Sequence, residues 1–259
     1  MCGRYLIEDE AYADILQILN DLNAAQNRIN VDNTSSVEGH ANGGTVHDEF
    51  IRGEVFPTNV APVITGDGVM AVKWGFPHWK NTGVIINARA ETALEKKMFG
   101  KPLRESRCVV PSSGFFEWSR SGGHDRGSSN SSGGGSRSSG DRSGGGSRSS
   151  GDRSGGNKKK DKYLLRRPGE HILYMAGIVN TFQDALGAPY SAFVILTTAA
   201  NEYVSPIHDR MPVILSPDEV DLWSRDDDFM EYVLHRSGPE LSSELSNEIS
   251  NEYYDNILD

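Results

Sequence analysis

The second residue of the chain, Cys2, stands in the opening Met-Cys-Gly-Arg-Tyr, and its position allows the most unusual reactivity of any residue in the sequence. We expect it to become the first residue, because an initiator methionine before a small residue is normally removed. A terminal cysteine carries an amine that titrates at about 7.7–8.0 and a thiol that titrates at about 8.5, on adjacent carbons. Such a pair can close a five-membered ring on an aldehyde. The alternative is an incidental cysteine at a frayed terminus.

Three further segments place a reactive polar group in a run of residues typical of a strand. They are residues 85–92 with Asn87 and Arg89, residues 111–118 with Glu117, and residues 197–212 with His208. Each group also has an ordinary explanation when it is taken singly. Glu117 could face solvent, His208 could bond within a loop, Asn87 could end a strand, and Arg89 could pair with Glu91.

Strands make up most of the elements that must position these groups. Runs rich in β-branched and aromatic residues predict strands at 55–64, 69–74, 84–87, 108–110, 114–118, 163–167, 172–179, 191–197 and 212–215. A helix is expected from Asp9, as N-cap, to about Asn23, and another near 229–235. Ser216 to Glu219 reads as a capping box that begins a further helix. The pattern predicts an α+β fold, a single domain around a curved, largely antiparallel β-sheet or barrel with peripheral helices.

Residues 119–162 interrupt this domain with a segment rich in Ser, Gly and Arg. Within it, residues 133–143 are repeated letter for letter at 144–154. Such a repeat buries too little apolar surface to offset its ordering entropy, so we expect a disordered insert between two parts, 1–118 and 163–238, of one domain. Its ten Lys and Arg against four Asp and Glu could attract phosphates, and a neutral expansion of a tolerant loop is the alternative. Residues 239–259 are expected to be an acidic, solvated C-terminal tail.

The bulk composition restricts the class of protein further. The net charge of −10 is concentrated near the end of the chain, where residues 216–259 carry thirteen Asp and Glu against two Arg, so a basic groove elsewhere is allowed. The two cysteines, Cys2 and Cys108, are too few for a disulfide framework or a cysteine metal site, and Cys108 reads as a buried apolar residue. The given sequence does not open with the basic and then apolar pattern of a signal peptide, and it contains no run of 18 apolar residues. We therefore expect an intracellular protein without metal or cofactor.

Taken together, six ordered segments resemble the SRAP (SOS response-associated peptidase) family. They are M-C-G-R-Y at the start, N-V-A-P at 59–62, W-G at 74–75, N-A-R-x-E-T at 87–92, R-C-x-x-P-x-x-G-F-x-E-W at 107–118 and I-H-D-R-M-P-V-I-L at 207–215. The resemblance runs from Cys2 to about Leu215, apart from the insert. It implies covalent capture of abasic sites in single-stranded DNA. The product would be a thiazolidine between Cys2 and the ring-opened deoxyribose.

The resemblance also implies a role for each matching residue. Cys2 would supply both nucleophiles, Asn87 would hold it by hydrogen bonding, Glu117 would be the acid/base residue, and His208 would lie beside the sugar. Arg4 and Arg89 match arginines at the DNA phosphates. Trp74 and Trp118, with Phe76 and Trp79, are rings near these motifs that could stack unpaired bases, although Trp74 and Phe76 could equally be core. Burial between aromatic residues would raise the pKa of Glu117 toward neutrality.

Three other functions are compatible with parts of this pattern. An N-terminal-nucleophile glutamine amidotransferase also begins Met-Cys-Gly and would show glutaminase activity. A cysteine peptidase would cleave somewhere other than after Met1, and a non-catalytic module that binds single-stranded DNA would not need Cys2. The sequence leaves open whether the adduct is reversible and whether lyase or autoproteolytic activity accompanies it. We expect a monomer, located in the cytoplasm with the nucleoid in a prokaryote or in the nucleus of a eukaryote.

Overall fold

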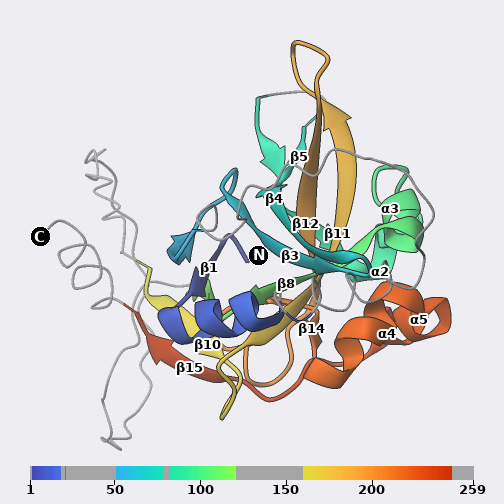
Figure 1. Ribbon diagram of the computed structural model, residues 1–259. Coiled ribbons are helices and arrows are strands. Elements are labelled where there is room, and N and C mark those ends of the chain that lie inside the picture. Colours follow the sequence, from blue (N-terminus) through green and yellow to red (C-terminus); the bar gives the residue numbers. More distant parts are fainter. Residues whose placement is uncertain (1, 19–20, 22–50, 79–81, 121–159, 247–259) are drawn as a thin grey trace, which may run out of the picture.

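The computed structural model describes residues 2–18, 21, 51–78, 82–120 and 160–246 of the chain. Two sheets dominate it (Figure 1). The first has five strands in the order β15-β10-β9-β1-β2, with bounds Ser242–Leu245, Lys162–Arg166, Gly114–Trp118, Arg4–Ile7 and Gly53–Val55. All of its strand pairs are antiparallel.

The second sheet curls into a barrel. Its main order is β13-β12-β4-β3-β8-β11-β14, and β7 also pairs with β12. Because β12 pairs with both β4 and β11, the strands β12, β4, β3, β8 and β11 close a ring. The bounds are Val60–Thr65 for β3, Gly68–Trp74 for β4, Asn87–Arg89 for β7, Arg107–Ser112 for β8, Leu173–Gln183 for β11, Pro189–Ala199 for β12, Arg210–Pro212 for β13 and Ile214–Leu215 for β14. Two short strands, β5 (Phe76–Pro77) and β6 (Val84–Ile85), form a separate pair.

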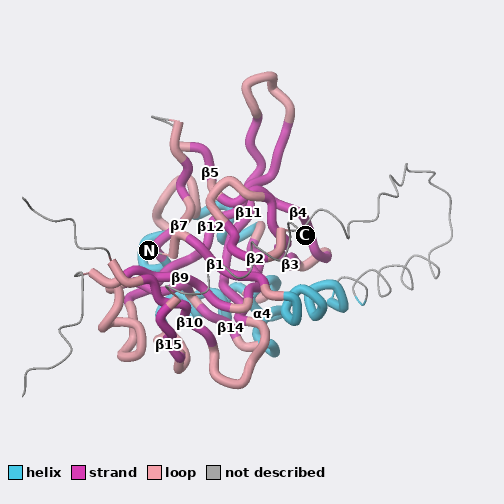
Figure 2. Tube along the Cα trace, turned by 90° about the vertical axis from the view of Figure 1, so that its left-hand side faces the viewer, coloured by secondary structure: helices cyan, strands magenta, loops and turns pink. Residues whose placement is uncertain are grey.

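The helices cover the outside of this barrel. Figure 1 shows α2 (Ala90–Ala93), α3 (Gly100–Glu105), α4 (Val220–Arg225) and α5 (Asp227–His235) grouped on one side. A 3-10 turn, η2 (Pro217–Glu219), leads into α4. Near the amino terminus, residues 9–18 are helical. Figure 2 shows the long β11–β12 hairpin projecting well beyond the rest of the barrel.

Apolar side chains are buried on both faces of the central barrel strands. Along β8, Cys108 and Val110 belong to the core between the two sheets, whereas Val109 belongs to the core beneath the helices. Along β12, Phe193 and Ile195 face the first core, and their neighbours face the second. Alternation along a strand explains this division, and burial on both faces explains why these strands are continuous apolar runs.

The structure confirms the predicted fold class and most of the predicted elements. The capping box is present, since the backbone N–H of Ser216 donates to Glu219 Oε2 at 2.8 Å. The α5 helix begins after Asp226, whose carboxylate accepts from the backbone N–H of Phe229. Cys108 is buried, in agreement with its interpretation as an apolar residue.

Some predictions about elements were wrong, and some elements were missed. The single strand expected at 55–64 is divided by a turn, in which Thr58 has φ 76° and Asn59 Oδ1 accepts from the backbone N–H of Phe56. Asp9 is the first helical residue and not the cap that precedes it. The short helices α2 and α3 were not predicted, because four or six residues are too few for a clear helical period.

The predicted C-terminal tail is also partly structured. Residues 242–245 form β15, which pairs with β10 although every residue of the strand is exposed. The strand was not predicted because its residues show no apolar alternation. It forms through backbone hydrogen bonds at the edge of the sheet, which do not depend on the side chains. The repeat at 133–154 and the end of the tail, residues 247–259, lie outside the described residues.

Candidate functional site

Cys2 lies directly before β1 and is completely buried. Its Sγ approaches the carbonyl oxygen of Arg4 at 3.6 Å. Burial raises the pKa of the Cys2 thiol well above its usual range, and the nearby negative charge of Glu117 raises it further. The thiol is therefore protonated at neutral pH, and it needs a base before it can act as a nucleophile.

Asn87 fixes the position of Cys2. Its Nδ2 donates to the Cys2 carbonyl oxygen at 2.8 Å. Asn87 is the first residue of β7 and pairs with Ile195 of β12, so its backbone belongs to the rigid barrel. The other atom of its amide, Oδ1, is buried and has no hydrogen-bond partner among the described residues. One side of the amide thus holds Cys2, while the other offers an acceptor within the site.

Glu117 lies on the inner face of the five-stranded sheet. Along β9, alternation places it on the same side as Phe115, a member of the core that includes Cys2. The Glu117 side chain is 2% exposed. Burial raises the pKa of its carboxyl to about 7, against the effect of the positively charged amino terminus of the chain. A carboxyl with this pKa can both donate and accept a proton near neutrality.

His208 is the second titratable group of the site. Its Nε2 lies 4.0 Å from Glu117 Oε2, and burial lowers the pKa of its imidazole. The backbone N–H of Arg210 donates to His208 Nδ1 at 3.0 Å, so the neutral ring carries its proton on Nε2, the nitrogen that faces Glu117. Asp209 Oδ1 also lies 3.1 Å from Nδ1, a contact that favours the protonated ring. The 4.0 Å distance is longer than a hydrogen bond, so a proton would pass between His208 and Glu117 through one bridging water or after a small movement.

An ion pair between two of the sequence segments brings them together, and sequence reasoning missed it. The Arg210 guanidinium binds both carboxylate oxygens of Glu91, at 2.6 and 2.9 Å, and also the Thr197 carbonyl oxygen. Glu91 was considered earlier as a partner of Arg89, which is instead exposed. The pair joins the start of α2 to β13, and β13 follows directly after His208. It holds the Asn87 and His208 segments in one arrangement.

Arg4 and Trp118 lie on the outer face of the same sheet. The Arg4 guanidinium carbon is 4.4 Å from the centre of the Phe56 ring and 5.4 Å from that of Trp118. Arg4 also donates to Glu54 Oε1 at 3.0 Å, and Lys162 donates to Glu54 Oε2 at 2.8 Å. Sequence reasoning missed Glu54 and Lys162 as neighbours of the site. No local signal could have found them, because Glu54 on β2 and Lys162 on β10 reach Arg4 and Trp118 only through strand pairing.

The assignment of Trp74 to DNA contact needs correction. Its ring is fully buried, it packs 5.1 Å from the ring of Tyr5 and 6.2 Å from that of Phe193, and its Nε1 donates to the Ile86 carbonyl oxygen. A ring enclosed in this way has no free face on which a base could stack. Phe76 is fully buried as well, and Trp79 lies outside the described residues.

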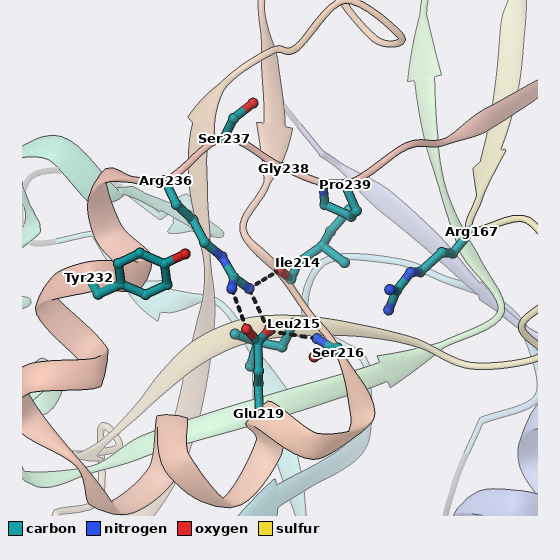
Figure 3. A pocket seen from close by; sticks show the side chains of 10 residues that line it. All are labelled: Arg167, Ile214, Leu215, Ser216, Glu219, Tyr232, Arg236, Ser237, Gly238 and Pro239. Carbon is teal, nitrogen blue, oxygen red and sulfur yellow. Dashed lines mark hydrogen bonds and ion pairs between the residues drawn. The ribbon is translucent and has the colours of Figure 1, made fainter.

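Other polar clusters lie on different elements. The pocket in Figure 3 is lined by residues of β14, η2, α5 and the segment after it, and its Arg236 guanidinium is paired with Glu219. This pairing lowers the pKa of Glu219 to about 2. Within the described part of the chain, no group of three or more His, Cys, Asp or Glu could hold a metal ion. No described helix is long and apolar enough to cross a membrane.

The arrangement is suited to capturing a carbonyl compound. A terminal amine and thiol at Cys2 would attack the same carbon, and Glu117 and His208 would move the protons. Arg4 and Trp118 lie one or two residues along the chain from this centre. They offer a cation and an aromatic ring at its rim.

Comparison with known proteins relates the chain to others. The family model described as SOS response associated peptidase (SRAP) matches residues 1–130 and 153–243. Abasic site processing protein YoaM of Bacillus subtilis is 30% identical over 67% of this chain and 68% of its own length. Abasic site processing protein YedK of Escherichia coli is 31% identical over 60% of this chain and 54% of its own. A crystal structure of a Bacteroides thetaiotaomicron protein has a TM-score of 0.64 at 19% identity, and the match covers 98% of this chain and 94% of that one.

Proposed function

The chain belongs to the SRAP family, and from that premise we propose that it processes abasic sites in single-stranded DNA by covalent capture at Cys2. The names of the related YoaM and YedK proteins support the choice of substrate. The observation that carries the proposal is the placement of Glu117. Its buried carboxyl has a pKa of about 7, lies 4.0 Å from His208, and acts electrostatically on the thiol of Cys2.

The reaction begins with ring opening and amine attack. An abasic deoxyribose hides its aldehyde in a closed ring, so a proton must reach the ring oxygen, and protonated Glu117 is the donor. The neutral amine of Cys2 adds to the aldehyde carbon and forms a carbinolamine. The C1 hydroxyl returns a proton to Glu117 as the aldehyde forms, so Glu117 can donate again when the carbinolamine loses water and leaves a protonated imine. This step breaks the C–O bond and expels the aldehyde oxygen as water.

Ring closure uses the thiol. Glu117, now a carboxylate, accepts the proton of the Cys2 S–H as sulfur adds to the carbon of the protonated imine, whose nitrogen keeps its proton as the ring amine. The balance is one aldehyde and one aminothiol giving one thiazolidine and one water. Because no imine remains, the product resists hydrolysis and β-elimination. The same groups can act in reverse, and release of the DNA by ring opening is part of the proposal.

The remaining residues would hold the reactants. Asn87 holds the Cys2 carbonyl oxygen, which keeps the amine and thiol beside Glu117. Arg4 and the exposed Arg89 would contact phosphates, and Trp118 would stack a base of an unpaired strand. The protein would act where its DNA lies, in the nucleoid region of a prokaryote or in a nucleus.

The test is a denaturing gel of the purified protein with a single-stranded oligonucleotide that carries one abasic site. Mass spectrometry first establishes that Met1 is absent. We expect a heat-stable shifted band with the wild type and with Cys108→Ala, the matched control at the other buried cysteine. Cys2→Ala retains a terminal amine, so its band should appear only when borohydride reduces the imine. No band from correctly processed wild type would overturn the proposal, and so would an unreduced, heat-stable band from Cys2→Ala.

A further inference from the structure

One face of the five-stranded sheet gathers charged and aromatic side chains at the rim of the candidate site. In the strand register Lys162 lies opposite Trp118, Arg4 lies opposite Phe116, and Glu54 lies opposite Leu6. Residues opposite one another in a sheet share a face, and Phe116 and Trp118 are two apart on β9, so all of these side chains are on one side. This is the side away from Glu117, which Phe116 and Trp118 flank in sequence.

The Glu54 carboxylate joins two cations on this face. One oxygen accepts from Arg4 at 3.0 Å and the other from Lys162 at 2.8 Å. The side chains of Glu54 and Lys162 are only 12% and 14% exposed, while Arg4 is 38% exposed. Water and salt therefore screen the cluster less than they screen an open surface pair. Arg4 gives the cluster its access to solvent.

The ratio of cations to carboxylates in the cluster around Glu54 differs from that in a neighbouring cluster on the same sheet. Arg166 of β10 is a single cation between two carboxylates, those of Glu8 and Glu244. In the cluster at the rim, one carboxylate is shared by two cations. A phosphodiester carries a single negative charge, and its oxygens would balance the charges of Arg4, Lys162 and Glu54.

Aromatic rings surround the two cations. Lys162 Nζ lies 3.9 Å from the centre of the Phe116 ring and 5.9 Å from that of the Trp118 ring. The Arg4 guanidinium carbon lies 5.4 Å from the centre of the Trp118 ring. Cations over ring faces are attracted by the ring quadrupole, which restrains both of them beside Trp118. A cationic pair next to an aromatic ring fits single-stranded nucleic acid, in which a phosphate and an unstacked base alternate.

We propose that Lys162 and Arg4, joined by Glu54, form a binding site for one phosphodiester of a single strand, beside a base stacked on Trp118. This assigns to Lys162 a role in affinity and none in the bond-making steps. The inference rests on the proposed function for the identity of the nucleic acid. The chemistry of the ligand, a phosphodiester, is inferred from the cluster alone.

The first experiment measures binding of an undamaged single-stranded oligonucleotide, so that its result does not depend on covalent capture. Each phosphate neutralised in a single strand contributes about 0.7 to the slope of log affinity against log salt. Lys162→Met should lower the slope by about that amount, so that its affinity between 50 and 200 mM salt falls about 2.6-fold less than that of the wild type. Lys162→Arg should keep the wild-type slope. The matched control is Lys101→Met, which removes a lysine from the exposed Lys101–Glu105 pair on α3.

The second experiment replaces single phosphates of the oligonucleotide by neutral methylphosphonates. At one position the replacement should weaken binding of the wild type clearly more than it weakens binding of Lys162→Met, in which only Arg4 is left to contact that phosphate. Melting curves establish that the variant is folded. A Lys162→Met slope equal to that of the wild type, or effects of variant and methylphosphonate that add at every position, would overturn the phosphate site. Failure of the covalent gel with a normal slope change would refute the proposed function alone.

Discussion

Replacement of Glu117 by Gln is the change that tests the site most directly. Gln keeps the size of the side chain and removes its ability to gain or lose a proton. General acid–base help of this kind is typically worth about 10²–10⁴ in rate, so capture by Glu117→Gln should be slower by that factor. The wild type should also show a rate that depends on pH in a way the variant does not.

The shape of the pH profile follows from two groups. The amine of Cys2 must be neutral, so the rate should rise through its pKa of about 7.7–8.0. The carboxyl of Glu117 must be protonated for ring opening, so the rate should fall above its pKa of about 7. The wild type should therefore have a maximum near pH 7.4, midway between the two values. Glu117→Gln should lose the falling limb, and its slow rate should continue to rise and level off above about pH 8.

Stability gives an independent check on the same carboxyl. Its pKa is raised in the folded protein, from 4.5 to about 7, so the native state binds more protons than the unfolded state between these values. The free energy of unfolding should then decrease as pH rises through this window, by about 3 kcal/mol at about 1.36 kcal/mol per pKa unit. Glu117→Gln should remove this decrease and unfold at higher denaturant concentration than the wild type at pH 8.

The assays are single-turnover capture from pH 5.5 to 9 and urea unfolding at pH 5 and pH 8. Glu54→Gln, a change in a carboxylate on the outer face of the same sheet, serves as the control and should keep the falling limb. A falling limb in Glu117→Gln at the same pH as in the wild type would refute the reasoning. So would a wild-type rate that is level from about pH 5 to about pH 8, because a carboxyl with an ordinary pKa would lose its proton in step with the amine becoming neutral.

Three further predictions follow from single contacts. Asn87→Ala should slow capture about 2- to 10-fold in the same assay, because a neutral hydrogen bond to Cys2 contributes about 0.5–1.5 kcal/mol; an unchanged rate would contradict this. Trp118→Ala should weaken binding of single-stranded DNA by about 1–3 kcal/mol with little change in melting temperature. Trp74→Ala should instead lower the free energy of unfolding in urea by about 3–5 kcal/mol. Weakened DNA binding by Trp74→Ala and loss of stability in Trp118→Ala would contradict both assignments. The pKa of Glu219 is lowered to about 2 in the folded state. Its contribution to stability is therefore present above its usual pKa and is lost as pH falls toward 2. Glu219→Gln should show a smaller loss of stability than the wild type between pH 5 and pH 2.5.

Much of the site could be predicted because its residues belong to strands. The strand at 114–118 contains three aromatic residues of clear β-propensity, and alternation places Glu117 opposite in direction to Phe116 and Trp118. The raised pKa was expected from burial between these two rings, but the burial comes from the opposite face, where the core contains Cys2 and Phe115. The hydrogen bond between Asn87 and Cys2 was implied by family resemblance, and the structure contains it at 2.8 Å.

The misassigned ring shows where a local pattern is insufficient. Trp74 and Trp118 both end strands and both lie near the motifs, so their sequences do not distinguish core from surface. Pairing of β4 with β12 brings Phe193 against Trp74 and closes the barrel over it. Trp118 is the last residue of β9, the central strand of the other sheet, and stays partly exposed.

The sequence by itself determined the candidate nucleophile, most of the strands and the titratable groups, because residue type, local propensity and alternation act over only a few residues. The tertiary structure decided which charges meet. Arg210 pairs with Glu91, 119 residues away, and Glu54 joins Arg4 to Lys162 across 50 and 108 residues. Such partners depend on which strands become neighbours, and strand pairing depends on the assembly of both sheets and not on any local pattern.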